Sequence, residues 1–264
     1  MSEKSDFIQA KIIEIQNKLA KPITAFQTGG FKPTGEKTEN WIGRVFLCKA
    51  DEAKPVTDNN GNRLYPLAQF YLPNLPFVPD ELKHIAWLTV FMGEEFPEVY
   101  ENQGTNGNGW LIREYTANDE LVEYEYEYEY EGEYEQKGMP TPFPLSFSFK
   151  EQDFPLWDGG GVPSDLEDEI CELAEDYDEE RDEEKDDCDI LDYYEDIVGD
   201  NHCYHHKFGG YPSFCQSGVE FENDCKFMFQ ISSDDKAEFN VVDSGSLMFA
   251  RNDKGDWVLY YDFY

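Results

Sequence analysis

The sequence predicts an α+β fold made mainly of antiparallel sheets in two related halves. Short apolar runs broken by Gly, Pro and Asn occur near both ends of the chain, which is typical of antiparallel strands. Helical spacing of apolar residues occurs at the N-terminus and again in an acidic middle segment. We therefore expect a single domain over the 264 residues, with an N-terminal helix and an acidic helical insertion.

The expected elements follow in chain order. An amphipathic helix is predicted over residues 3–21, with Phe7, Ile8, Ile12, Ile15 and Leu19 on its apolar face and Pro22 at its end. The divisions that we predict are the N-terminal helix (1–24), the first half (25–118), the acidic middle segment (119–200) and the second half (201–264).

Each half contains apolar runs that we interpret as strands. The runs of the first half are 41–48, 67–72 and 85–92, and those of the second half are 227–231, 246–251 and 257–262. Residues 58–62 (Asp-Asn-Asn-Gly-Asn) indicate a turn. They lack the spacing of acids and glycine that a calcium-binding loop requires.

The two halves share an order of features. Gly29-Gly30 precedes an apolar strand with an inner Gln and then an apolar strand that ends in Phe, and Gly209-Gly210 precedes the same order. We interpret this repetition as an internal duplication.

The acidity of the chain limits its partners. The 57 Asp and Glu against 21 Lys and Arg give a formal net charge of −36. Nucleic acid and anionic membrane surfaces would be repelled, because binding to either depends on Lys and Arg. A basic protein is the expected partner. Without a secretory signal, a run long enough to span a bilayer or a disulfide framework, we expect a cytoplasmic protein.

Most of the negative charge lies in two segments. Residues 119–135 carry a net charge of −9, and residues 165–196 carry −17. In the first segment, Tyr and Glu alternate from 123 to 131, which predicts a strand with all glutamates on one face. Such a face is either solvated surface or an acidic ladder that binds a basic partner. The ladder consists of Glu123, Glu125, Glu127, Glu129 and Glu131.

The second acidic segment begins with a predicted helix. Ser164 is placed to cap it, with Glu167 at the capping-box position, and apolar residues from Leu166 to Tyr177 form one face. Helical spacing resumes near Ile190 and stops at Gly199. The segment is either a solvated insertion or a contact surface. The residues expected to contact a partner are Glu175, Asp178, Glu179, Glu180, Asp182 and Glu183.

The sequence contains no nucleophile elbow, phosphate loop, dinucleotide fingerprint or zinc-protease motif. Three histidines cluster between 202 and 206, but no second ligand pair has matching spacing, so we expect neither a metal nor a cofactor. His206, Gln230 and Asp243 are candidates for a ligand pocket near the second double glycine, with a structural polar network as the other interpretation. Asp243 also fits a turn, since Asp-Ser-Gly is common turn chemistry.

The C-terminal residues carry a family resemblance. His206 to Pro212 (HKFGGYP), Gln216, Phe229 to Asp234 (FQISSD) and Asp243 to Gly245 (DSG) resemble the YwqG-like family of bacterial proteins of unknown function, as do residues 66–72 with Leu75-Pro76. Asn240 to Asp243 replaces the family's Met-Trp-Gly-Asp, so this corner departs from the family pattern. The resemblance implies a cytoplasmic, mainly antiparallel α+β fold in two halves. Because some relatives lie beside polymorphic-toxin genes, it also implies immunity proteins.

Two functions of different classes follow. The first is an immunity protein that neutralises a basic toxin acting on nucleic acid or nucleotides, by direct binding through the acidic segments. The alternative is an enzyme that binds a small ligand or a metal, with its site between the two halves.

Overall fold

The computed structural model describes residues 3–52, 54–96, 104–123, 138–157, 161–178, 192–216 and 219–264. In this part of the chain the fold is α+β and mainly antiparallel, as predicted. The strands are β1 (Ile23–Thr28), β2 (Asn40–Ile42), β3 (Leu47–Lys49), β4 (Tyr65–Tyr71), β5 (Trp87–Met92), β6 (Gly104–Thr105), β7 (Trp110–Tyr115), β8 (Leu121–Glu123), β9 (Phe143–Lys150), β10 (Lys207–Gly209), β11 (Lys226–Ser232), β12 (Ser246–Arg251) and β13 (Trp257–Asp262). The helical elements are α1 (Glu3–Leu19), α2 (Ser164–Asp178), the 3₁₀ turns η1 (Leu72–Asn74) and η2 (Asp80–Leu82), and the π-helical turn η3 (Tyr193–Val198).

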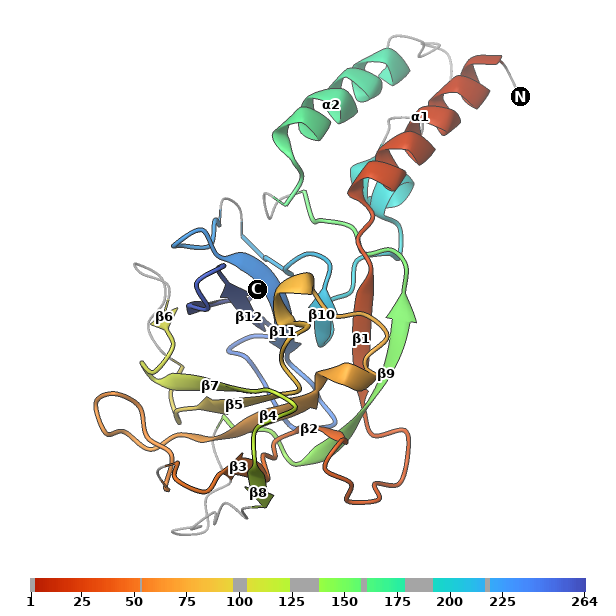
Figure 1. The fold of residues 1–264 in the computed structure, drawn as a ribbon. Coiled ribbons are helices and arrows are strands. Elements are labelled where there is room, and N and C mark those ends of the chain that lie inside the picture. Colours follow the sequence, from red (N-terminus) through yellow and green to blue (C-terminus); the bar gives the residue numbers. More distant parts are fainter. Residues whose placement is uncertain are drawn as a thin grey trace.

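One curled sheet of eleven strands forms the body of the described chain (Figure 1). Its order is β6-β13-β12-β11-β10-β1-β9-β2-β4-β5-β7, and β3 and β8 form a separate ribbon. The end strands β6 and β7 are neighbours in the sequence, so the curl brings the two ends of the sheet together. Glu114 of β7 holds this closure, because it accepts hydrogen bonds from Arg251 Nε at 2.9 Å and Nη2 at 3.3 Å, and from Trp257 Nε1.

Aromatic side chains from both halves meet in the main core of the sheet. The rings of Phe208, Phe229 and Phe249 stack in series, with centroids 4.9 and 4.5 Å apart. Phe70 of the first half meets Phe208 edge-on at 5.0 Å. Both geometries are favourable for aromatic pairs, so this core joins the halves rather than dividing them.

α1, α2 and η3 form a second layer at one end of β1 and β9 (Figure 1). Ile12, Ile15 and Leu19 of α1 pack with apolar residues of α2 and η3, which confirms the predicted N-terminal and acidic helices. Phe7 does not belong to this face: it is 52% exposed. It precedes Ile8 by one residue and so lies about 100° around the helix from the buried stripe, which the sequence interpretation overlooked.

The predicted strands of the second half are confirmed as β11, β12 and β13, and residues 67–72 and 85–92 fall largely in β4 and β5. The run 41–48 differs, because it divides into β2 and β3. Gly43 turns the chain between them, with φ of +71° and its N–H donating to the carbonyl of Leu67 at 2.7 Å.

The halves share a detailed arrangement around their inner glutamines. The pairing of β4 with β5 shifts register two residues before Gln69, and that of β11 with β12 shifts two residues before Gln230. Both glutamines are buried, and each accepts a backbone N–H through Oε1, from Phe46 and from Ser213. Trp41 pairs with Gln69 and Lys207 with Gln230, so Gly43 and Gly209 each lie two residues after the residue that pairs with the glutamine.

Candidate functional site

A buried carboxylate organises the polar centre of the second half. Asp153 follows β9, and its Oδ2 accepts hydrogen bonds from Lys207 Nζ at 2.9 Å and from the backbone N–H of Tyr211 at 2.8 Å. Its Oδ1 accepts from the N–H of Cys203 at 2.7 Å. Both charged side chains are 0% exposed. Burial lowers the pKa of Lys207, and the Asp153 carboxylate opposes that effect.

The double glycine of the HKFGGYP segment shapes the backbone around Asp153. Gly209 and Gly210 both have positive φ, at +79° and +69°, which turns the N–H of Tyr211 towards the carboxylate. The Tyr211 hydroxyl donates to the carbonyl of Leu19 at 2.7 Å. The segment therefore connects β10, the carboxylate and the end of α1.

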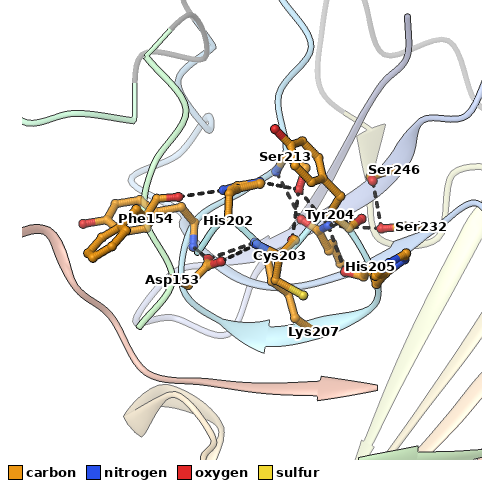
Figure 2. Close-up of polar contacts among 12 residues, drawn as sticks. Asp153, Phe154, His202, Cys203, Tyr204, His205, Lys207, Ser213, Ser232 and Ser246 are labelled. Carbon is orange, nitrogen blue, oxygen red and sulfur yellow. Dashed lines mark hydrogen bonds and ion pairs between the residues drawn. The ribbon is translucent and has the colours of Figure 1, made fainter. Parts of the chain in front are cut away.

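His202 and Ser213 form a hydrogen-bonded pair beside this ion pair (Figure 2). His202 Nδ1 lies 2.6 Å from the carbonyl oxygen of Phe154, and Nε2 lies 2.9 Å from Ser213 Oγ. Because a carbonyl oxygen only accepts hydrogen bonds, Nδ1 carries the ring proton. The ring is neutral, and its Nε2 accepts a hydrogen bond from the Ser213 hydroxyl. Burial lowers the pKa of His202 to about 4, and the charge of Lys207 acts in the same direction.

This pair has the connectivity of a serine nucleophile and its base, but its electrostatics do not support that chemistry. A general base works best with a pKa near the working pH. His202 would have to gain a proton in a buried position close to Lys207. The geometry therefore holds Ser213 in a fixed orientation rather than activating it.

The stability of the protein is expected to fall in mild acid because of His202. Its ordinary pKa of 6.5 applies in the unfolded chain and about 4 in the folded one, so the unfolded state binds the extra proton between these values. Stability is fully present above pH 6.5, and roughly 3 kcal/mol of it is lost as the pH falls to 4. Urea unfolding at several pH values measures this loss. His202→Gln should flatten that part of the profile, and a variant with the wild-type slope would contradict the assignment.

Gln230 connects the pair to the neighbouring strands. Its Nε2 donates to Ser213 Oγ at 2.9 Å and to Ser232 Oγ at 3.0 Å, and the hydroxyls of Ser232 and Ser246 are 2.8 Å apart (Figure 2). His206 joins through Ser232, whose backbone N–H donates to Nδ1 at 3.0 Å. The structure thus brings His206 and Gln230 into one network, as the sequence analysis proposed.

Asp234 lies at the edge of this network. His206 Nε2 lies 3.3 Å from Asp234 Oδ2, and the N–H of Ala237 donates to Oδ1 at 2.8 Å. Burial alone would raise the pKa of Asp234, but these donors together lower it to about 2. Asp234 therefore keeps its negative charge across the physiological range.

A pocket of about 230 Å³ opens beside Ser213 and Ser246. Its other lining residues are Tyr204, Cys215, Ser244, Gly245 and Tyr264. Asp243 belongs to the turn 242–244 and its side chain is exposed, so it lies next to the pocket rather than inside the network. Asp243 therefore lies in a turn, as the Asp-Ser-Gly pattern indicated.

A family model described as "Domain of unknown function (DUF1963)" matches residues 43–254. The chain belongs to this family. None of the curated proteins matches the DUF1963 chain. The matched range includes Asp153, Lys207, Ser213 and Gln230. The resemblance to the YwqG-like family stays a prediction.

The acidic residues predicted to bind a partner are only partly within the described part of this DUF1963 protein. Glu123 ends β8 and lies 3.5 Å from Lys37 Nζ, Glu175 is exposed on α2, and Asp178 is the last residue of α2. The other members lie outside the described residues: Glu125, Glu127, Glu129, Glu131, Glu179, Glu180, Asp182 and Glu183.

Across the described ranges of the DUF1963 chain, no three His, Cys, Asp or Glu side chains gather as metal ligands would. The ring nitrogens of His202 and His206 are occupied by the contacts given above, and His205 is exposed. In the same ranges, no helix has the length and apolar character needed to cross a bilayer.

Sequence reasoning missed Asp153 and Ser213, which are central to the polar network described above. Asp153 follows a strand and Ser213 follows Pro212, and neither position has a local pattern that distinguishes it from ordinary loop residues. The double glycine was the available signal, because two successive glycines indicate a close approach of the backbone to another group.

Proposed function

We propose that this protein binds a basic protein partner, and that it acts as an immunity protein against a basic toxin whose target is nucleic acid or a nucleotide. The observation that carries the proposal is the acidic outer face of α2. Asp165, Asp168, Glu172 and Glu175 are exposed at spacings of three and four residues, which places them on one side of the helix.

The opposite side of α2 is anchored. Leu166, Ile170 and Leu173 are buried in the helical layer, so α2 cannot rotate its carboxylates towards the protein. Like charges three and four residues apart destabilise a helix slightly, and a cationic partner would remove that cost. The charge on this face is therefore available to a partner.

The described cations near α2 are already engaged by other acids. Lys18 Nζ lies 2.7 Å from Glu169 and 3.2 Å from Glu14, and Lys11 Nζ lies 3.0 Å from Glu14. Among the described residues, none of the four exposed acids of α2 has an ion pair. An unneutralised face on a chain of net charge −36 favours capture of a basic protein by electrostatic steering.

Reversing charge on this face should slow capture of the partner. The triple variant Asp168→Lys, Glu172→Lys and Glu175→Lys is expected to lower the association rate constant about tenfold at low salt, and less at high salt. The partner is first obtained by pull-down of the tagged protein from its native cells at low salt, and rates are then measured by surface plasmon resonance.

The matched control reverses three exposed acids elsewhere: Glu36→Lys, Asp51→Lys and Asp253→Lys. It changes the net charge equally, so a specific face predicts that only the α2 variant is slowed strongly. If association were slowed equally in both variants, the effect would come from net charge and not from the α2 face. A pull-down that returns only generic basic proteins, all released at low salt, would remove the immunity proposal. The same assay on Glu125→Lys, Glu127→Lys and Glu129→Lys tests the predicted acidic ladder.

We also propose that the two halves arose by internal duplication. The support is the matching position of the register shifts before Gln69 and Gln230, together with the matching bonds from their Oε1 atoms. In this proposal the halves diverged beside the glutamine, where the second half has Lys207 and the first half has Trp41.

A further inference from the structure

The pocket beside Ser246 has a floor that offers more hydrogen-bonding capacity than the protein uses. Ser246 Oγ donates to Ser232 Oγ at 2.8 Å, so the Ser246 hydroxyl proton is used within the protein and its oxygen is left as an acceptor. Ser246 lines the pocket and is 4% exposed. The hydroxyl oxygens of Ser246 and Ser213 each keep a lone pair that can accept a hydrogen bond from a donor in the pocket.

The rim of the pocket is aromatic. Tyr204 and Tyr264 are 47% and 70% exposed, and both line the opening. The faces of their rings carry partial negative charge, which attracts a cation placed over them. Cys215 also lines the pocket. Burial is the main cause, and the charge of Asp262 the second, that raises the pKa of its thiol to about 11.

The formal charges around the pocket are negative. Its lining contains no Lys, Arg or His within the described residues. Asp262 lies directly behind Cys215, whose backbone N–H donates to its Oδ2 at 2.7 Å. Asp243 precedes Ser244 in the chain, and its backbone carbonyl accepts a hydrogen bond from the N–H of Tyr264 at 3.2 Å. The buried cation Lys207 is neutralised by Asp153 at 2.9 Å.

We infer that this pocket binds the cationic head of an amine or guanidinium compound, with the head between the two tyrosine rings and its N–H groups on the serine oxygens. The volume of about 230 Å³ is below the range for drug-sized ligands, which suits a single side-chain-sized group. The same chemistry is supplied by a free small molecule or by an arginine or lysine on a protein. The inference does not rest on the proposed function of α2.

An NMR titration of the whole ¹⁵N-labelled protein tests the inference. The probes are N-acetyl-arginine amide and its neutral counterpart N-acetyl-citrulline amide, which has nearly the same shape without the charge. We expect the arginine probe to shift the backbone signals of Cys215 and Ser246, and the citrulline probe to bind at least tenfold more weakly. Comparable binding of the two probes, or no shift at these residues, would overturn the inference.

Two variants locate the site. Tyr204→Leu and Tyr264→Leu each remove a ring from the exposed rim and should weaken binding of the arginine probe roughly three- to thirty-fold. The control Tyr194→Leu removes a tyrosine that is 38% exposed on η3 and should leave binding unchanged. Unchanged binding in both rim variants would place the probe elsewhere and overturn the inference.

Two further arms separate the sources and the proposals. The affinities of the pentapeptide Gly-Gly-Arg-Gly-Gly and of agmatine, a free guanidinium amine, are compared. Tighter binding of the pentapeptide indicates that the natural ligand is a protein side chain, and tighter binding of agmatine indicates a free small molecule. The variant with three reversed charges on α2 should keep its affinity for the arginine probe. Failure of the protein-capture experiment therefore leaves this result intact, and failure of the titration leaves the α2 experiment intact.

Discussion

Lys207→Met is expected to destabilise the protein by about 3–5 kcal/mol, because it leaves Asp153 as a buried carboxylate without its cation. The ion pair is 0% exposed on both sides, so water cannot replace the lost partner. Two backbone N–H groups still bind the carboxylate, but they carry no full charge. Equilibrium unfolding in urea at pH 7 measures the change in the free energy of unfolding.

Lys150→Met is the matched control, since Lys150 is an exposed lysine on β9 and its loss should cost less than about 0.5 kcal/mol. The double variant Asp153→Leu with Lys207→Met should lose less stability than the two single variants added together, because it buries no lone charge. Additive losses, or a Lys207→Met protein as stable as the wild type, would show that the pair does not hold the centre of the second half.

Gly210→Ala is expected to cost about 2–5 kcal/mol, from backbone strain and steric overlap together. The residue has φ of +69°, and a Cβ built there would lie within contact of Asp153 Oδ2 and of Ile23 Cγ2. The substitution therefore presses on the buried ion pair and on β1 at once. Thermal and urea unfolding of the variant report the loss.

Gly35→Ala separates the two contributions. Gly35 also has a positive φ, at +82°, but a Cβ there meets nothing within 4 Å. Its substitution carries only the conformational cost, about 1–2 kcal/mol. Similar losses at Gly35 and Gly210 would mean that the carboxylate accommodates the methyl group, and the account of the double glycine would fail.

The sequence predicted the parts of this fold that local patterns determine. Short apolar runs indicated β11, β12 and β13, which are buried on both faces, and helical apolar spacing indicated α1 and α2, which bury one face. The same patterns did not show that the run 41–48 turns at Gly43, since the turn depends on a hydrogen bond to Leu67 in another strand.

The candidate site was predictable only in part. His206 and Gln230 were candidates because they are polar residues expected near the second double glycine. The importance of Asp153 arises from contacts with residues about fifty positions later in the chain, which no short window of sequence contains. Asp243 was a candidate for the same pocket, but it lies in a turn and its side chain is exposed.

The position of β1 in the sheet has a consequence for synthesis of the protein. β1 leaves the ribosome well before β10, although β10 is one of its two neighbours in the sheet, with Ile23 paired to Gly209. At about 5–20 residues per second, roughly 10–40 s pass before that neighbour is made. During this interval the nascent chain carries an unpaired strand edge, which is the kind of surface that molecular chaperones protect. The protein is thus expected to complete its fold only after translation has passed β10.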